Sequence, residues 1–290
     1  MKNQKYFYKI QRILIYIKHL SITERIQGKL LGNSIKTYWW NGVKNFGDLI
    51  TPYLLRKLDF TPIHVKHQHA KIILVGSILQ RISNDYSGII LGAGLINDMK
   101  ICFKNARILG LRGAYTKKNL GVKHNIILGD PGLVAVKYFK ERQKKKFLLG
   151  IVPHFYDKNN YRINQIKEMF PEQITIINVN QGVNAVFKHI DKCSYIISSS
   201  LHGLVTADAL NIPNAWLKLS KKATGDGFKF LDYYSAFGLR YKPIEITGKE
   251  TLDSLIANTH NIDKSLVDEV KSDLEKILLR VRQEVQLLDN

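Results

Sequence analysis

The chain has 290 residues and a mass of 33.3 kDa, which is room for about two domains of ordinary size. Hydrophobic residues make up 45% of it and charged residues 23%, so the composition is that of a globular protein and excludes a disordered, collagen-like or disulfide-scaffolded chain. The net charge of +20 indicates an anionic partner, which is a phosphorylated ligand, a nucleic acid or a membrane surface.

The N-terminal segment is both basic and apolar. Residues 1–30 contain seven basic residues and one acidic residue, and the longest uncharged apolar run, Ile13–Ile17, is too short for a spanning helix or a secretory signal. Two interpretations stay open: this segment is a helix in peripheral contact with the inner face of the cell membrane, or a helix packed on the first domain. Since the only cysteines are Cys102 and Cys193, we expect a cytoplasmic protein.

The following part of the chain alternates short apolar runs with helical patterns, which is typical of βαβ units and a parallel sheet. The predicted strands are Ile35–Trp40, Lys71–Gly76, Gly88–Gly92, Ala106–Leu111 and Asn125–Leu128. The predicted helices are Phe46–Leu58 and Ala114–Leu120. The basic segment Lys137–Lys146, with six basic residues and one acidic residue, predicts a solvated linker.

A second series of the same kind follows this segment. Its predicted strands are Phe147–Val152, Ile174–Val179, Tyr195–Ser198 and Asn214–Leu217, and its predicted helices are Tyr161–Phe170, Val183–Lys192, Leu201–Leu210 and Phe228–Phe237. From Ile262 to Leu288 an apolar residue recurs every three or four positions, which predicts one long amphipathic helix.

Together the two series predict an α/β fold of two tandem Rossmann-like domains. The predicted domains are residues 1–140 and residues 141–290, the second including the terminal helix. Because ligands of such folds bind at the carboxyl ends of the strands, we expect the site in the cleft between the two domains.

Glycines and polar residues at predicted strand ends are the candidate binding residues. The segment NGVKNFGD, residues 41–48, supplies Asn45, Gly47 and Asp48, although a capped helix start explains the same pattern. Two further turns make room for backbone close to a ligand, or are simple turns, because neither completes a dinucleotide fingerprint. They contain Gly76 and Ser77, and Gly92 and Gly94.

Two charged residues also follow predicted strands. Arg112 lies where a strand ends and a helix begins, and an arginine there adds to the positive end of the helix dipole, which suits a bound anion. A solvated surface arginine is the alternative. Asp130 lies in LGDPG, a sequence that turn chemistry alone also explains.

The segment YIISSSLHG, residues 195–203, is the most informative one. Serines end an apolar strand directly before a predicted helix, where hydroxyl and backbone N–H groups form a site for phosphate or carboxylate. His202 is then a proton donor or a second anion contact, whereas the alternative is a helix cap with a structural histidine. The candidate residues here are Ser198, Ser199, Ser200, Leu201, His202 and Gly203.

Several other functions lack their motifs. The serines are not in a nucleophile elbow, and His64, His67 and His69 lack the spacing of a metal site, so no metal is expected. Nucleic-acid-binding motifs are also absent, and no nucleic acid partner is expected.

The ordered motifs NFGD, VGSIL, LGAGL, LGLRGAYTKKNL, LGDPGLV, GIVPHF and SSSLHGLVTADALNIPNAWL resemble the polysaccharide pyruvyl transferase family, from about Trp39 to Phe237. The resemblance implies a glycosyltransferase-B-like architecture of two facing Rossmann-like domains. It also implies transfer of a pyruvyl group from phosphoenolpyruvate to a sugar of a bacterial surface polysaccharide, or of its lipid-linked precursor, as a cyclic ketal. Phosphoenolpyruvate is then a donor substrate, and no cofactor is needed.

By the same resemblance, His202 is the candidate acid and a donor contact, Arg112 contacts the donor anion, and Asp48 orients or deprotonates the acceptor hydroxyl. Many family members have an arginine directly before the LHG element, where this chain has Ser200. We therefore expect Lys218 or Lys222 to replace that arginine. A glycosyltransferase that uses a nucleotide-sugar is the alternative function, because the same glycines and basic residues suit a diphosphate.

Overall fold

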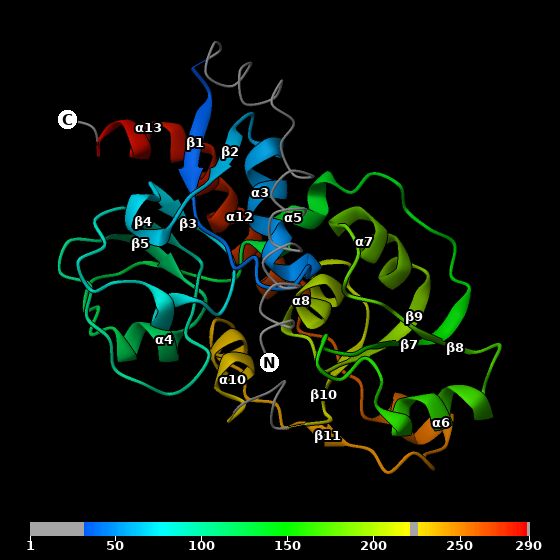
Figure 1. Cartoon of the computed structure of the whole chain (residues 1–290). Coiled ribbons are helices and arrows are strands. Elements are labelled where there is room, and N and C mark those ends of the chain that lie inside the picture. The colour runs from blue at the N-terminus through cyan, green and yellow to red at the C-terminus, as the bar shows by residue number, and fades with distance from the viewer. Residues whose placement is uncertain (1–31, 221–225, 289–290) are drawn as a thin grey trace, which may run out of the picture.

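The computed structural model describes residues 32–220 and 226–288, which form two parallel β-sheets with helices packed around them (Figure 1). The first sheet has the order β2-β1-β3-β4-β5-β6, and the second has the order β11-β10-β9-β7-β8. The strands of the first sheet are β1 (Ser34–Thr37), β2 (Thr61–His64), β3 (Ile72–Ile73), β4 (Ile89–Leu91), β5 (Arg107–Leu111) and β6 (Ile127–Leu128). Those of the second are β7 (Phe147–Val152), β8 (Ile174–Ile176), β9 (Cys193–Ser198), β10 (Asn214–Lys218) and β11 (Ile244–Glu245).

The helices connect these strands and cover the sheets. The α-helices are α3 (Phe46–Lys57), α4 (Ala114–Asn119), α5 (Gly132–Ala135), α6 (Tyr161–Met169), α7 (Val183–Asp191), α8 (Leu201–Ala209), α10 (Phe228–Ser235), α11 (Leu252–Ala257), α12 (Lys264–Leu279) and α13 (Val281–Gln286). Short 3₁₀-helices are η1 (His67–His69), η2 (Leu79–Arg81) and η3 (Val136–Tyr138).

Both sheets have the same topology. When the strands are counted within each sheet, the order begins 2-1-3-4-5 in both, and every pairing between these strands is parallel. In this doubly wound order the chain leaves the first strand on one side and the third on the other, so a crevice opens at their carboxyl ends. The two crevices lie after β1 and β3 and after β7 and β9.

One apolar core joins the two sheets. Figure 1 shows α3, α5 and α8 between them, and Ile50 of α3, Val134 of α5 and Val205 of α8 belong to one buried cluster with Val152 of β7. Because these side chains are at most 2% exposed, the helices have no freedom to separate without exposing apolar surface. The shared core therefore fixes the carboxyl-end crevice of one sheet next to that of the other.

The predicted strands and helices are largely confirmed, with shorter strands than expected. Two edge strands, β2 and β11, were not predicted from the apolar patterns. Strand β2 contains Pro62, which has no N–H for a strand ladder and is tolerated at an edge, and β11 has only two residues. Neither strand is buried on both faces, so neither carries the continuous apolar run that marks the inner strands.

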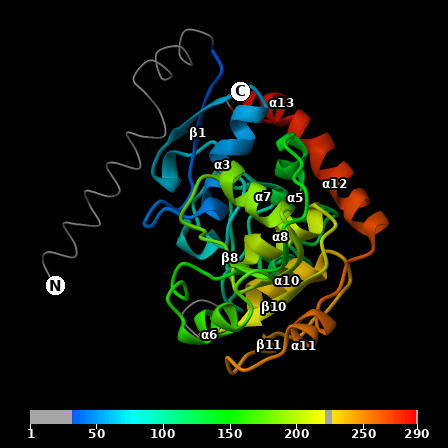
Figure 2. The ribbon, with the colours of Figure 1, turned by 90° about the vertical axis from the view of Figure 1, so that its right-hand side faces the viewer.

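The C-terminal helix differs from the prediction in two ways. It is two helices, α12 and α13, which meet at Arg280. It also returns to the first sheet: α12 contacts α5 and β6, and Glu284 of α13 forms a 2.5 Å ion pair with Arg107 of β5. Figure 2 shows α12 running along one side of the molecule from α11 to α13. The division into residues 1–140 and 141–290 stays a prediction.

The basic segment 137–146 is anchored and is not simply solvated. Asp191, which is fully buried at the end of α7, accepts hydrogen bonds from Nε and Nη2 of Arg142 at 3.1 and 3.0 Å. Lys145 donates from Nζ to the backbone oxygens of Asp191 and Cys193, at 2.9 and 2.8 Å. This connection between the sheets is therefore fixed to the second one.

Some sequence predictions lie outside the described residues, among them the membrane-surface interpretation of the N-terminal segment and the role of Lys222. Within the described ranges no helix is both long enough and apolar enough to cross a membrane. The two cysteines are unpaired, with Cys102 exposed and Cys193 buried.

Candidate functional site

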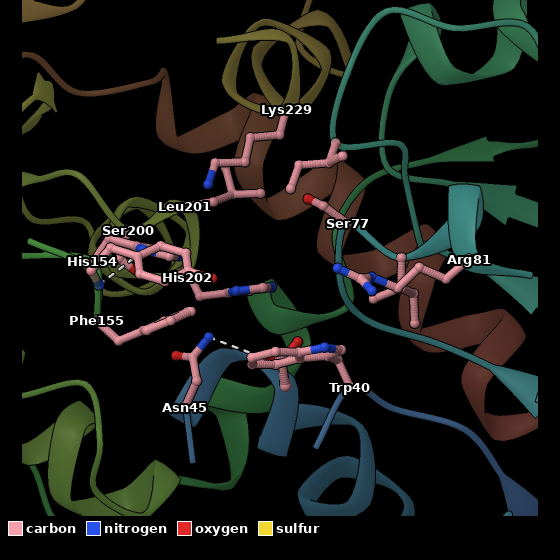
Figure 3. Close-up of a pocket in the computed structure, with 14 residues that line it drawn as sticks. Trp40, Asn45, Ser77, Arg81, His154, Phe155, Ser200, Leu201, His202 and Lys229 are labelled. Atoms are coloured by element: carbon pink, nitrogen blue, oxygen red, sulfur yellow. Dashed lines mark hydrogen bonds between the residues drawn. The ribbon is translucent and has the colours of Figure 1, made fainter. Parts of the chain in front are cut away.

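A pocket lies where the carboxyl ends of the two sheets meet (Figure 3). Its lining comes from the segments after the first and third strands of each sheet, together with one residue after β4 and one on α10. From the first sheet come Trp40, Asn45, Asp48, Ser77, Ile78, Arg81 and Ile96, and from the second sheet and α10 come His154, Phe155, Tyr156, Ser200, Leu201, His202 and Lys229. The doubly wound topology favours ligand binding at this position of a sheet, and the pocket lies at this position of both sheets.

The start of α3 forms one wall of the pocket. Asn45 is the N-cap, and its side chain accepts a hydrogen bond from the backbone N–H of Gly47 at 3.3 Å. The Nδ2 group of Asn45 donates to Oδ2 of Asp48 at 2.9 Å. The backbone N–H of Phe46 donates to the Val179 oxygen at 2.9 Å, which ties this wall to the second sheet.

Asp48 is a buried carboxyl group with a strongly raised pKa. Burial raises the pKa of Asp48 to about 7, although the hydrogen bond from Asn45 and the charges of Lys229 and Arg81 act in the opposite direction. The capped helix start that the sequence offered as an alternative is thus present, and it delivers Asp48 into the pocket.

His202 lies in the first turn of α8 and is 7% exposed. Gly47 makes room for its ring, because a Cβ at that position would come within 2.2 Å of Nδ1. Burial lowers the pKa of His202, with Arg112 and Lys229 acting in the same direction and Asp130 opposing them. The lowered pKa favours the neutral imidazole at physiological pH.

Lys229 of α10 is a buried cation on the pocket wall, at 5% exposure. Burial and the charge of Arg112 lower the pKa of Lys229 to about 8, against the attraction of Asp157 and Asp48. Lys229 brings a positive charge to the pocket wall, and this charge is suited to the negative charge of a ligand.

The structure places Arg112 behind the pocket wall. Its guanidinium is fully buried, pairs with Asp232 at 2.8 Å and donates to the Ser77 hydroxyl and the Leu95 backbone oxygen. Gly94 provides space for it, since a Cβ there would come within 2.5 Å of the guanidinium carbon. Arg112 reaches the pocket lining through its hydrogen bond to Ser77.

The three serines at the end of β9 and directly after it have different surroundings. Ser198 donates to the backbone oxygens of Val152 and Ser200, and Ser199 donates to Asp157 at 3.0 Å. These hydrogen bonds join the end of β9 to the end of β7 and to the segment that follows β7. Ser200 lines the pocket and precedes α8 without a side-chain capping hydrogen bond.

The predicted glycines act mainly through close packing. Gly203 packs against Ser198, and Gly92, with a φ of +88°, packs against Pro131. Gly76 has a φ of +122° and lies beside the Asp48 carboxylate. Asp130 is fully buried behind His202 and is absent from the pocket lining.

Sequence reasoning missed Lys229, Arg81 and the aromatic residues of the pocket. A lysine within the apolar sequence GFKFLDYY is a signal that was available, because a charged residue among buried ones needs a reason. Lys218, which the sequence suggested as a replacement cation, instead pairs with Glu245 at 2.7 Å outside the pocket. Across the described ranges, three or more His, Cys, Asp or Glu side chains nowhere gather as metal ligands would.

The fold and the site define an α/β protein with a pocket between two doubly wound sheets, and cationic and titratable side chains are part of the lining of this pocket. The chain belongs to the polysaccharide pyruvyl transferase family, whose model matches residues 4–220. This confirms the resemblance seen in the motifs, but the match begins near the N-terminus, earlier than Trp39.

Proteins similar to the chain include two curated relatives and a solved structure. It is 31% identical to the uncharacterized protein L143 of Acanthamoeba polyphaga mimivirus, over 69% of this chain and 74% of that protein. It is 24% identical to the succinoglycan biosynthesis protein ExoV of Rhizobium meliloti (strain 1021), over 77% and 71%. The wall teichoic acid polymerase TagF matches 99% of this chain and 98% of its own, with a TM-score of 0.46 and 10% identity.

Proposed function

We propose that the protein transfers a pyruvyl group from phosphoenolpyruvate to two hydroxyls of one saccharide, forming a cyclic ketal and releasing phosphate. Family membership and the likeness to ExoV support a pyruvyl transferase that acts on a polysaccharide. The observation that carries the proposal is that one pocket brings together the buried side chains of Lys229, Asp48 and His202, with burial raising the pKa of Asp48 to about 7 and lowering that of His202.

The anionic groups of the donor need cations and N–H donors. The pocket is lined by Lys229, Arg81 and Ser200. Ser200 is also the N-cap of α8, so the first backbone N–H groups of this helix lie next to it. We assign Lys229 the role that an arginine at position 200 would have. A charge-assisted hydrogen bond from a buried ammonium group is about twice as strong as a neutral one.

The chemistry requires one proton to be delivered and two to be removed. A proton adds to the methylene carbon of phosphoenolpyruvate, and one saccharide hydroxyl attacks the adjacent carbon and loses its proton. The second hydroxyl then attacks the same carbon, and phosphate leaves with the remaining proton. The products are the ketal and inorganic phosphate, so atoms and charges balance without a redox cofactor.

The pKa directions favour a particular division of roles. With a pKa near 7, the Asp48 carboxyl is protonated in part of the molecules at neutral pH and suits the acid that protonates the methylene carbon. The neutral His202 suits the base that accepts a hydroxyl proton. We propose this assignment in place of the one that the family resemblance implied, in which His202 is the acid.

The proposal extends to architecture and location. The facing crevices of the two sheets support a glycosyltransferase-B-like arrangement of two Rossmann-like domains. We also propose that the protein works in the cytoplasm on a saccharide of a surface polysaccharide or its lipid-linked precursor. We further propose that the basic N-terminal segment makes peripheral contact with the membrane. In that case the full-length protein sediments with anionic liposomes, and deletion of residues 1–25 abolishes this binding.

The decisive experiment combines the protein with phosphoenolpyruvate and a panel of saccharides. We expect saccharide-dependent phosphate release and a new ketal methyl signal in the proton NMR spectrum. Asp48→Asn and His202→Ala should each lower the rate by about 10²–10⁴-fold. If nucleotide-sugars stabilise the protein in thermal-shift assays, phosphoenolpyruvate does not, and no saccharide releases phosphate, the protein is a glycosyltransferase and the proposal is wrong.

A further inference from the structure

Aromatic side chains form one side of the pocket. Trp40 follows β1, whereas Phe155 and Tyr156 follow β7, so the rings come from both sheets. The rings of Trp40 and Phe155 are stacked, with centroids 5.8 Å apart and an interplanar angle of 22°. The centroids of Phe155 and Tyr156 are 4.1 Å apart. We call these three residues the aromatic platform.

The aromatic platform is held in place but remains accessible. Gly42 lies against the indole of Trp40, because a Cβ there would come within 2.5 Å of the ring. Trp40 and Phe155 are half-buried, and Tyr156 is 61% exposed. Stacked, restrained rings with open surface bind a flat apolar partner at little conformational cost, because few rotamers are lost.

The aromatic platform lies across the pocket from the buried cation. Figure 3 shows Lys229 at one side of the pocket and Trp40 and Phe155 at the other, with His202 between them. Asn45 and Asp48 line the same pocket. A ligand that uses both sides therefore places its anionic group at Lys229 and an uncharged ring on the aromatic platform.

We propose that the aromatic platform is the acceptor subsite and binds the saccharide as a closed pyranose ring, stacked through its C–H face. This inference rests on the proposed function, which makes the acceptor a saccharide. The axial C–H bonds of a pyranose present a weakly positive, apolar face, which complements the negative face of an aromatic ring. The hydroxyls then project from the rim of the sugar toward the polar residues of the pocket.

The geometry of the aromatic platform also selects among saccharides. A pyranose holds neighbouring hydroxyls and its C–H face in one rigid arrangement. An open-chain alditol has similar hydroxyls but no persistent face, so it gains little from stacking. Discrimination between the two forms is therefore a direct consequence of recognition by aromatic rings, whereas recognition by hydrogen bonds alone would separate them less.

The test measures binding without turnover, using methyl hexopyranosides of the gluco, galacto and manno series and the corresponding alditols. Saturation-transfer NMR and calorimetry should detect the pyranosides and not the alditols. Trp40→Ala should weaken pyranoside binding about five- to tenfold, and Trp40→Phe should restore most of it. The control is Tyr161→Ala, which removes an aromatic ring that is exposed as Tyr156 is but lies on α6, outside the pocket lining, and it should have no effect.

Equal binding of pyranosides and alditols, unchanged binding by Trp40→Ala, or no pyranoside binding by the wild-type protein would each overturn the inference. A folded Trp40→Ala protein is recognised by an unchanged melting temperature, and Phe155→Leu provides a second variant. If phosphate release persists in Trp40→Ala with an unchanged acceptor KM, the acceptor subsite is wrong while the proposed function stands. If Trp40-dependent pyranoside binding occurs but phosphate is never released, the subsite is supported while the donor assignment is wrong.

Discussion

Nε2 of His202 lies 3.6 Å from Oδ2 of Asp130, and neither atom has a hydrogen-bond partner within the described residues. The carboxylate is fixed from its other side, since Oδ1 accepts from the backbone N–H of Gly132 at 2.8 Å. Asp130 raises the pKa of His202, whereas burial lowers it. We infer that Asp130 is a positioning residue that acts through the imidazole.

Asp130→Asn tests this relationship. Loss of the negative charge should lower the pKa of His202 further and make the imidazole a weaker base, reducing kcat by about tenfold or more. The acidic limb of the profile of kcat/KM against pH should move to lower pH, as should the NMR titration of the imidazole. A reduced kcat with both pH midpoints unmoved would mean that Asp130 only supports the fold.

The second prediction concerns the pH dependence of the reaction. If protonated Asp48 is the acid, kcat/KM for phosphoenolpyruvate should fall above pH about 7, because this ratio reports the pKa values of the free protein. Asp48→Glu should keep part of the activity with a displaced limb, and Asp48→Asn should keep donor binding. A ratio that instead rises through pH 7 would make Asp48 the base.

The same shift predicts a stability effect. The folded protein holds the Asp48 proton with a pKa of about 7 instead of 3.8, so the unfolded chain loses this proton first as the pH rises. The stability contribution is therefore complete below pH about 4 and is lost as the pH rises to about 7. Urea unfolding should show no effect of Asp48→Asn at pH 4 and a gain of up to about 4 kcal/mol at pH 8.

A third set of variants tests Lys229 as the donor contact. Lys229→Met should raise the KM for phosphoenolpyruvate about 10–100-fold, the scale of a lost charged hydrogen bond. In the Asp48→Asn background the Asp48 charge no longer raises the pKa of Lys229, so donor affinity should fall as the pH rises toward about 8 and Lys229 loses its charge; Lys229→Arg should remove this fall. Lys218→Met is the control, because Lys218 is paired with Glu245 outside the pocket. Equal effects of Lys218→Met and Lys229→Met would exclude a specific contact.

The fourth prediction uses a glycine pair. Gly47→Ala places a methyl group within 2.2 Å of Nδ1 of His202, so the ring must move, and we expect kcat to fall at least tenfold. Gly182→Ala is the matched control, since it adds the same group at the N-cap of α7 with nothing within 4 Å. Both variants should melt within a few degrees of the wild-type protein. Equal activity of the two variants would show that the position of the His202 ring does not matter.

The fifth prediction separates stability from binding at Arg112. This side chain and Asp232 form a fully buried ion pair, and removal of one partner should cost about 3–5 kcal/mol. The double variant Arg112→Met, Asp232→Asn removes both charges and keeps an acceptor for Thr116, so it should recover most of the loss. If the donor KM stays high after stability is recovered, Arg112 also contributes to donor binding.

The residues that reach the site show what local pattern predicts well. Asn45 and Asp48 lie at a helix start, and Ser200 and His202 lie at a strand–helix junction, so both pairs were recognisable from short segments. Trp40 gave no such signal, and the lysine within GFKFLDYY indicated only that Lys229 has a buried role, because its neighbours in the pocket come from segments distant in the chain. Arg112 was recognisable as a strand-end residue, but its partner is Asp232, 120 positions away.

By itself the sequence determined the parallel α/β class, the order of most elements and the family. These follow from apolar periodicity and from glycine and polar residues at strand ends, which are local properties of the chain. Only the tertiary structure decided that α12 and α13 return to the first sheet, that Asp130 lies behind His202, and that Lys229 is the buried cation of the pocket. Burial and the distances between remote side chains set pKa values and contacts, and these depend on how the helices pack.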